Sequence, residues 1–239
     1  MLQTCRKDKP AYDQVVSRGP LPLAPIAEGE IGETDLGAAV RLPKEQRRAQ
    51  VIAAARATFL ASGYHAASME EIADRAGVSK PVLYQHFPGK LDLYLAILEE
   101  GIEALLAATQ QAVRSTPDNK VRVQETIRTY FTFFDDPQGA IRLVLGTDLM
   151  SEPKVRKRID ATKLALARII AAVIAEDTGL DTEQSLLLGS GLLGLAEGGA
   201  LRWLAHKGER MPLDEAADLT AHLAWRGIAS FPLSHPPQA

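Results

Sequence analysis

The chain has 239 residues, of which 46% are hydrophobic and 24% charged, a composition typical of a globular protein with one large domain or two smaller ones. Its net charge of −3 excludes a polycation, so any surface for nucleic acid must be local. Residues 44–90 carry seven Lys/Arg against four Asp/Glu, which makes this segment a basic patch on an otherwise acidic chain.

Three features argue against a secreted or membrane-spanning protein. Cys5 is the single cysteine and cannot form a disulfide within the chain, which favours a reducing compartment. The first residues are polar and no apolar run follows them, so no signal peptide is expected. The most apolar window, 186–205, contains Glu197 and Arg202, whereas a bilayer span needs about 20 mostly apolar residues. We therefore expect a cytoplasmic protein that does not bind a membrane.

The N-terminal segment 1–43 contains five prolines and no helical periodicity, so a disordered tail is expected there. The pattern changes directly after this segment. Val51, Ala55 and Phe59 recur at every fourth position, which predicts a helix. Gly63 follows them where a C-terminal cap would sit, so the helix is expected to end at this residue.

The next segment predicts two short helices joined by a tight turn. Ser68 and Glu71 have the spacing of a capping box, in which each side chain binds the other's free backbone N–H. Gly77 marks the turn and Ser79 can cap the second helix. Pro81 is tolerated in the first turn because its missing N–H has no helical partner there. Two helices joined in this way form a helix-turn-helix.

Helical stripes continue along the rest of the chain. Apolar residues repeat at helical spacing over 91–113, and further stripes follow between proline-containing breakers. Two more helices are expected over 181–207 and 212–229. No alternating strand pattern occurs, so the expected fold class is all-α with about nine helices.

The second helix of the helix-turn-helix has two different faces. Leu83 and Phe87 lie four residues apart and are expected to face the core. The opposite face carries residues suited to a major groove: Lys80, Pro81, Tyr84 and Gln85. There Gln can pair with adenine, and Lys can bind guanine or phosphate. An ordinary helical hairpin with a solvated polar face is the alternative.

At these residues the chain resembles the TetR family of transcriptional regulators. The matching residues are Gly63-Tyr64, Ile72-Ala73, Ala76-Gly77-Val78-Ser79, Tyr84-x-His86-Phe87 and Lys90. The resemblance implies a regulator that binds double-stranded operator DNA and is not an enzyme. The residues expected at the DNA are Arg47, Tyr64, Ser68, Ser79, Lys80, Pro81, Tyr84, Gln85, His86 and Lys90.

The resemblance also implies a domain organisation. A three-helix DNA-binding domain, residues 44–90, would precede a larger helical domain, residues 91–232, and a short disordered tail, residues 233–239, would close the chain. The larger domain would hold a hydrophobic small molecule and form a homodimer through the last two long helices. Ligand binding would then favour a dimer with a different spacing of its recognition helices.

A narrower resemblance connects the chain with the actinobacterial regulators of fatty-acid synthase genes, which sense long-chain acyl-CoA. Beyond the DNA-binding segment it rests on short motifs: Gln138-Gly139, Arg142-Leu143, Glu152-Pro153, Gly179-Leu180-Asp181 and Arg202-Trp203. The resemblance implies a long-chain acyl-CoA as effector. The alternative is another hydrophobic drug or metabolite that controls efflux or catabolic genes.

Apolar residues of the larger domain are candidates for the effector cavity, because a helical domain of this size can enclose one. They are Leu106, Phe131, Phe134, Leu145, Leu149, Ile170, Leu192 and Leu195. Many residues of this kind simply pack in a core. The basic run Lys154 to Arg158 could meet a phosphorylated head group, although a solvated face is the commoner interpretation.

The run Gly189-Ser-Gly-Leu-Leu-Gly194 matches the dinucleotide fingerprint G-x-G-x-x-G. That motif requires a preceding strand, which the sequence does not offer, so an NAD-dependent enzyme is a remote alternative. We expect the glycines to let two helices approach closely. The five histidines show no metal-ligand spacing, so neither a metal nor another cofactor is expected.

Overall fold

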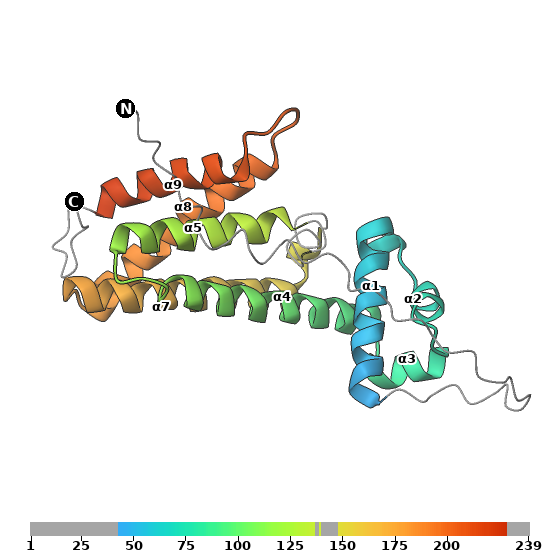
Figure 1. Ribbon diagram of the computed structural model, residues 1–239. Coiled ribbons are helices and arrows are strands. Elements are labelled where there is room, and N and C mark those ends of the chain that lie inside the picture. Colours follow the sequence, from blue (N-terminus) through green and yellow to red (C-terminus); the bar gives the residue numbers. More distant parts are fainter. Residues whose placement is uncertain (1–42, 137–138, 140–147, 229–239) are drawn as a thin grey trace, which may run out of the picture. The chain divides into compact units, whose positions relative to one another are not determined.

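The computed structural model describes residues 43–136, 139 and 148–228. Its helices are α1 (Lys44–Ala66), α2 (Met69–Arg75), α3 (Lys80–His86), α4 (Lys90–Ala112), α5 (Asn119–Asp135), the 3-10 helix η2 (Asp148–Ser151), α7 (Pro153–Thr178), α8 (Thr182–Leu204) and α9 (Leu213–Ile228). These ranges contain helices and no strand, which confirms the expected all-α class (Figure 1). The two expected tails, apart from Pro43, and the segment around Leu145 lie outside the described residues.

Helix α1 follows the predicted pattern. Val51, Ala55 and Phe59 are buried, so the stripe with a spacing of four residues forms its inner face. Gly63 has φ 78° and ψ 164°, a backbone conformation that glycine adopts readily and other residues do not. The regular helix therefore breaks at the predicted residue, and the last three residues of α1 lie beyond the kink.

The turn between α2 and α3 is a Schellman motif. The N–H of Gly77 donates to the carbonyl of Asp74, and the N–H of Val78 donates to the carbonyl of Ala73. Gly77 has φ 62°, the left-handed conformation that this motif requires. At the start of α2 the hydroxyl of Ser68 accepts a hydrogen bond from the N–H of Glu71 at 3.0 Å, which is the serine half of the expected capping box.

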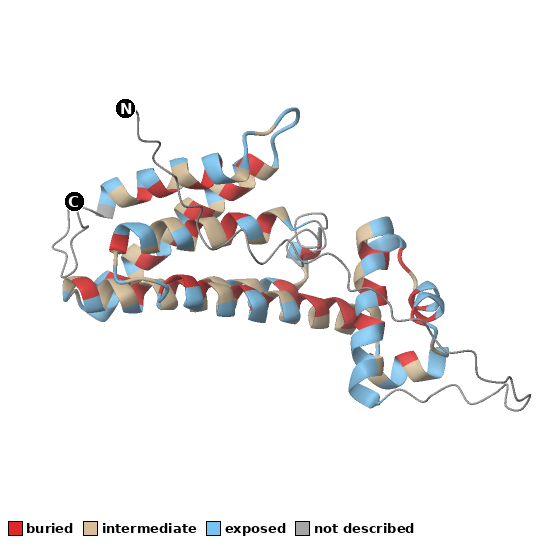
Figure 2. Ribbon diagram, viewed as in Figure 1, coloured by how far each residue is buried: buried red, intermediate tan, exposed pale blue. Residues whose placement is uncertain are grey.

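The first hydrophobic core joins α1, α2 and α3 to the first half of α4. Ile72 of α2, Leu83 of α3, and Leu93 and Ile97 of α4 are completely buried in it. Helix α4 also packs against α5 and α7, so it continues from the helix-turn-helix into the larger helical unit. Figure 2 shows buried residues along one side of α4 and exposed residues along the other.

The second core lies among α5, α7, α8 and α9, with the second half of α4 contributing Leu105. Helices α7 and α8 make the most extensive contact. Gly189 explains how closely they approach, because a Cβ atom at this position would lie 2.6 Å from the carbonyl oxygen of Ala167. The expected role of Gly189 in close helix packing is therefore confirmed.

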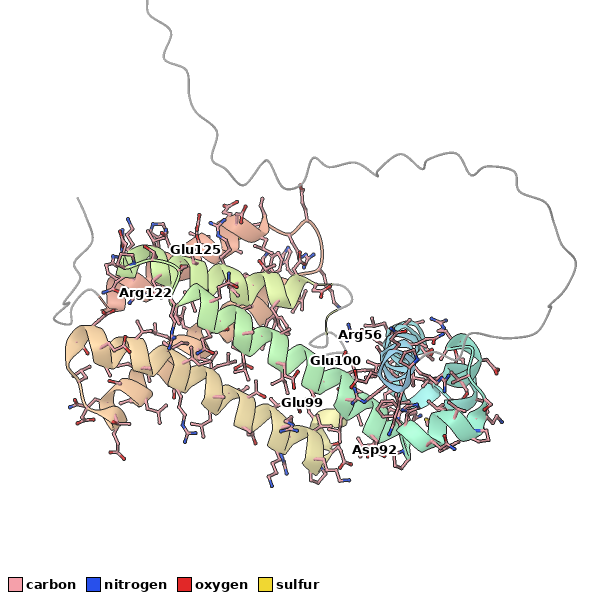
Figure 3. All side chains as sticks on the ribbon, turned by 60° about the horizontal axis from the view of Figure 1, so that its bottom comes forward. Arg56, Asp92, Glu99, Glu100, Arg122 and Glu125 are labelled. Atoms are coloured by element: carbon pink, nitrogen blue, oxygen red, sulfur yellow. The ribbon has the colours of Figure 1, made fainter. Side chains whose placement is uncertain are left out.

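Two adjacent carboxylates on α4 contact two different neighbours. Glu100 accepts a hydrogen bond from Arg56 of α1 at 2.7 Å, and Glu99 forms an ion pair with Arg158 of α7 at 2.6 Å. Figure 3 shows Arg56 beside Glu100. Partly exposed pairs of this kind contribute at most about 1 kcal/mol each. These two ion pairs join α4 to α1 and to α7, and so help to fix the orientation of α4.

Each helix in the described part of the chain is too short or too polar to span a lipid bilayer.

Candidate DNA-binding surface and effector cavities

Helix α3 presents the face that the sequence predicts. Leu83 is 0% exposed and Phe87, directly after the helix, is 4% exposed. The opposite side is open to solvent: Ser79, Lys80, Pro81, Tyr84 and Gln85 are exposed. The α3 face, defined as these five residues, offers an ammonium, an amide, two hydroxyl groups and a proline ring. These are groups that bind base edges and phosphates in a major groove.

Lys80 has a partner within the helix-turn-helix. Its ammonium lies 3.1 Å from the carboxylate of Glu70 in α2, and both side chains are more than half exposed. Hydrogen bonding to the backbone of α2, together with the bond from Lys80, lowers the pKa of Glu70. Glu70 therefore stays charged at neutral pH and lies beside the residue expected to approach DNA.

The other expected DNA contacts lie in different settings. Ser79 occupies the N-cap position of α3 but makes no capping hydrogen bond through its side chain, so its hydroxyl is available to a ligand. His86 is half-buried at the end of α3. Arg47 is half-buried in the first turn of α1. Sequence reasoning missed Arg48, whose guanidinium lies 5.2 Å from the ring centre of Phe87 and covers this core residue.

The side chain of Lys90 joins the start of α4 to the segment between α1 and α2. Its ammonium donates to the carbonyls of His65 at 3.1 Å and Ala67 at 2.8 Å. It also lies 4.7 Å from the ring centre of Tyr64, which in turn packs edge-on against Tyr94. Burial, with smaller contributions from nearby carboxylates, raises the pKa of Tyr64. The geometry gives Lys90 and Tyr64 a structural role, and their contact with DNA stays a prediction.

Cavity 1 lies between α5, α7 and α8, towards the end of α4. It has a volume of about 90 Å³ and is lined mainly by aliphatic side chains. Ile170, Val173 and Leu192 form part of this lining, and Trp225 of α9 completes it. Cavity 1 is therefore suited to an apolar group such as a hydrocarbon chain.

Cavity 2 lies nearer to the helix-turn-helix. It has a volume of about 210 Å³ and is lined by Leu98, Ile102 and Phe134, among others. Leu98 and Ile102 also belong to the core that α4 shares with α1. A group that entered cavity 2 would thus press on the helix that leads to the DNA-binding unit.

Tyr130 and Leu166 line both cavities and form a partition between them. Tyr130 is 7% exposed, and its ring stacks on Phe134 with a centre-to-centre distance of 4.8 Å. Burial raises the pKa of Tyr130, and the carboxylate of Glu197 raises it further, so the phenol stays neutral. One aromatic and one aliphatic side chain therefore stand between the two cavities.

The expected effector residues divide into two groups. Ile170 and Leu192 line cavity 1, and Phe134 lines cavity 2. The other described members pack in the cores and line neither cavity 1 nor cavity 2: Leu106, Phe131, Leu149 and Leu195. Leu145 lies outside the described residues. Sequence periodicity identifies an inward face but does not distinguish a residue in a core from one that lines a cavity.

Arg122 holds one end of cavity 1 together. Its guanidinium donates to Asp177 and to Asn119, each at 2.7 Å, and to the carbonyl of Thr116 from two nitrogens at 3.1 and 3.2 Å. Side-chain exposure is only 15% for Arg122 and 10% for Asp177. Sequence reasoning missed this pair because residues 55 positions apart give no local pattern. Figure 3 labels Arg122 on α5.

Helices α8 and α9 expose three large apolar side chains. Leu187 is 73% exposed, Leu219 57% and Leu223 65%. On α8 the same exposed stripe continues through Gly191 and Gly194, where added Cβ atoms would meet nothing within 4 Å. We call this surface the α8–α9 face. Exposed leucines beside small residues are typical of a surface that another protein covers.

The chain is similar in sequence to known bacterial regulators. Residues 51–97 match the family model described as bacterial regulatory proteins, tetR family. The chain is 38% identical over 194 residues to the HTH-type transcriptional activator FasR of Mycolicibacterium smegmatis, which covers 81% of this chain and 88% of the relative. The similarity therefore extends well beyond the helix-turn-helix.

Solved structures show the same architecture. A tetR-family transcriptional regulator from Streptomyces coelicolor is 26% identical, with a TM-score of 0.63 over 77% of this chain and 81% of that one. The transcriptional regulator FadR from Bacillus subtilis, solved in complex with stearoyl-CoA, is 20% identical, with a TM-score of 0.62 over 75% of this chain and 98% of that one. At this level of identity, the likeness to FadR shows that the two proteins share a fold.

Proposed function

The chain belongs to the TetR family of bacterial transcriptional regulators, and we propose that it is a homodimeric regulator of fatty-acid biosynthesis genes whose effector is a long-chain acyl-CoA. As a member of this family it is a DNA-binding regulator rather than an enzyme. The dinucleotide-like run Gly189 to Gly194 lies inside α8, where no phosphate-binding loop forms, which removes the NAD-dependent alternative.

The similarity to FasR is the observation that carries the proposal. It spans 88% of that relative and so includes the helices that form the cavities as well as those that bind DNA. The division into a DNA-binding domain, residues 44–90, and an effector domain, residues 91–232, is part of the proposal. It is supported by the family match over 51–97 and by the separate cores on either side of the middle of α4.

The cavities support a long apolar effector that changes the structure on binding. Cavities 1 and 2 measure about 90 and 210 Å³, and ligand pockets usually occupy roughly 300–1,000 Å³. A long chain would therefore have to displace the partition of Tyr130 and Leu166. Entry into cavity 2 would then move the part of α4 that packs against α1, and so favour another position of the recognition helices.

The α8–α9 face supports the homodimer. In a twofold dimer each copy would cover the exposed leucines of the other, and the glycines would allow close approach. Two recognition helices could then enter successive major grooves, which lie about 34–36 Å apart on one side of DNA.

The test begins with the protein purified from cells and examined by native mass spectrometry. A retained long-chain acyl-CoA on a dimer is the expected result. Operator DNA is then obtained by selection from a random duplex library, and palmitoyl-CoA is expected to change its affinity for the protein in a gel-shift titration. A retained uncharged lipophile, with no response to palmitoyl-CoA, would favour a regulator of efflux or catabolic genes instead.

A further inference from the structure

We infer that a groove beside cavity 1 binds the phosphate groups of an amphipathic effector through Arg114 and Arg168. This arginine groove, which has a volume of about 590 Å³, runs along the loop after α4 and one side of α7. The inference rests on the proposed function, because it concerns the head group of the effector whose acyl chain occupies the cavities. It assigns the ligand class as a hydrocarbon chain attached to a phosphorylated head.

The arginine groove and cavity 1 share a wall. Val113, Arg122 and Val173 line both of them, so the groove lies on the other side of this wall of the cavity. The two spaces differ in chemistry, since cavity 1 is lined mainly by aliphatic groups and the groove by charged and hydroxyl-bearing side chains as well. A molecule that displaced Val113 or Val173 of this wall could therefore hold its chain in cavity 1 and place its head in the groove.

The groove is lined by three arginines, Arg114, Arg122 and Arg168, which differ in how many of their N–H donors are already bonded. Arg122 is fixed by Asp177, Asn119 and Thr116, so most of its donors are already used and it serves as part of the wall. Arg114 and Arg168 are exposed, and neither forms an ion pair with another residue in the described ranges. Both guanidinium groups are accessible on one groove, and each carries the paired N–H donors that bind phosphate oxygens.

Negative charge in the groove is limited. Glu176 lines it too, but on α7 it lies eight residues beyond Arg168, which is about 12 Å along the helix axis. The basic run at the start of α7 is a weaker candidate for a head group. There Arg158 is paired with Glu99, and exposed Arg156 lines neither the groove nor cavities 1 and 2.

The experiment compares two thioesters that share the same acyl chain. Calorimetric titration measures the affinity of the full chain for palmitoyl-CoA and for S-palmitoyl-pantetheine, which lacks every phosphate. Each exposed arginine–phosphate pair contributes up to about 1 kcal/mol, or roughly fivefold in affinity. The variant Arg114→Gln/Arg168→Gln should therefore lose up to about 25-fold in affinity for palmitoyl-CoA and less than about twofold for S-palmitoyl-pantetheine. Added salt should weaken the complex of the unaltered protein with palmitoyl-CoA and leave the complex with S-palmitoyl-pantetheine unchanged.

Arg156→Gln is the matched control, because it removes an exposed arginine of α7 outside the groove, and it should leave both affinities unchanged. Thermal unfolding of all variants checks that the fold is retained. An equal loss for both thioesters, no loss for either, or the same loss in the Arg156 variant would overturn the arginine groove alone. If the unaltered protein binds neither thioester, the acyl-CoA effector itself is wrong, and the groove assignment falls with it.

Discussion

Lys80 lies on the exposed α3 face and within 3.1 Å of Glu70, so one side chain combines a DNA-binding candidate with a local ion pair. Because the pair is open to water, holding it together contributes little to stability. Lys80 can therefore exchange Glu70 for a phosphate or a guanine when DNA approaches. Gln85, on the same face, can read a base without losing a charged partner.

The variants Lys80→Ala and Gln85→Ala are each expected to weaken operator binding. A good contact to a base contributes about 1–3 kcal/mol, which corresponds to roughly 5- to 150-fold in affinity. Gel-shift titration with the selected operator measures the loss, and circular dichroism checks that the helices remain. Unchanged affinity in both variants would show that the α3 face does not read the DNA.

Glu70→Gln is expected to change operator affinity in the opposite direction to Lys80→Ala. It removes the carboxylate beside Lys80 while preserving the size of the side chain, so repulsion between this position and phosphates disappears. Affinity for operator and for unrelated duplex should rise together, by up to about fivefold at low salt, and the gain should shrink as salt is added. A loss of affinity here would mean that Glu70 positions Lys80 rather than competing with DNA.

Tyr130 is expected to limit which acyl chains fit, because it separates cavity 1 from cavity 2. Tyr130→Ala should join the two spaces and shift the preference among acyl-CoAs of increasing length towards longer chains. Removing a buried aromatic ring should also lower the free energy of unfolding by about 3–5 kcal/mol. Phe134→Ala, which enlarges cavity 2 alone, is the matched control. The same length preference in the Tyr130 variant and in the unaltered protein would contradict the partition.

Among the helices, the close packing of α7 against α8 depends on the absence of a Cβ atom at Gly189. Gly189→Ala would place a methyl group 2.6 Å from a backbone oxygen of α7, and backbone cannot move aside as a side chain can. The expected loss in the free energy of unfolding is about 1–3 kcal/mol. Thermal or urea denaturation measures it.

Gly191→Ala is the control for Gly189→Ala. It lies two residues further along α8, and an added Cβ there would meet nothing within 4 Å in the same chain. Alanine favours a helix over glycine by up to about 1 kcal/mol, so this variant, measured at a protein concentration at which the chain is a monomer, should be as stable as the unaltered protein or slightly more stable. Equal destabilisation by both substitutions would show that close packing at Gly189 is not the cause.

Helix α4 contributes residues to both hydrophobic cores. It contributes Leu93 and Ile97 to the core of the helix-turn-helix and Leu105 to the core around the cavities. Its neighbouring carboxylates Glu99 and Glu100 add ion pairs to α7 and α1. A displacement of α4 would therefore be transmitted to α1, and from there to α2 and α3.

At the scale of the whole molecule, the α8–α9 face is expected to hold two copies together. Leu219→Glu/Leu223→Glu should turn the dimer into a monomer, because two carboxylates would replace apolar contacts at the interface. Operator affinity should fall with it, since a monomer can place only one recognition helix. Sedimentation or light scattering measures the mass, and gel shift the affinity.

Leu164→Glu is the control for the dimer variant. Leu164 is 42% exposed but lies on α7, so its substitution should leave both mass and affinity unchanged. A dimer that persists in the Leu219/Leu223 variant would place the interface elsewhere.

The helix-turn-helix could be predicted closely from the sequence because its signals are local. A capping serine, a glycine in the left-handed conformation and an apolar pair four residues apart each act within one turn of chain, so Ser68, Gly77 and Leu83 lie where the pattern puts them. The cavities could not be predicted in the same way. Leu106 and Ile170 carry the same apolar signal and both pack in a core, yet of the two only Ile170 lines cavity 1.

The all-α class, the break at Gly63 and the exposed face of α3 follow from the sequence alone, because helix periodicity and turn chemistry are properties of neighbouring residues. Packing of the helices brings Lys90 to two backbone carbonyls, Arg122 to Asp177, and Tyr130 to a position between two cavities. Those arrangements depend on contacts between residues far apart in the chain. Such contacts leave no periodic trace, and they exist only once the helices have packed.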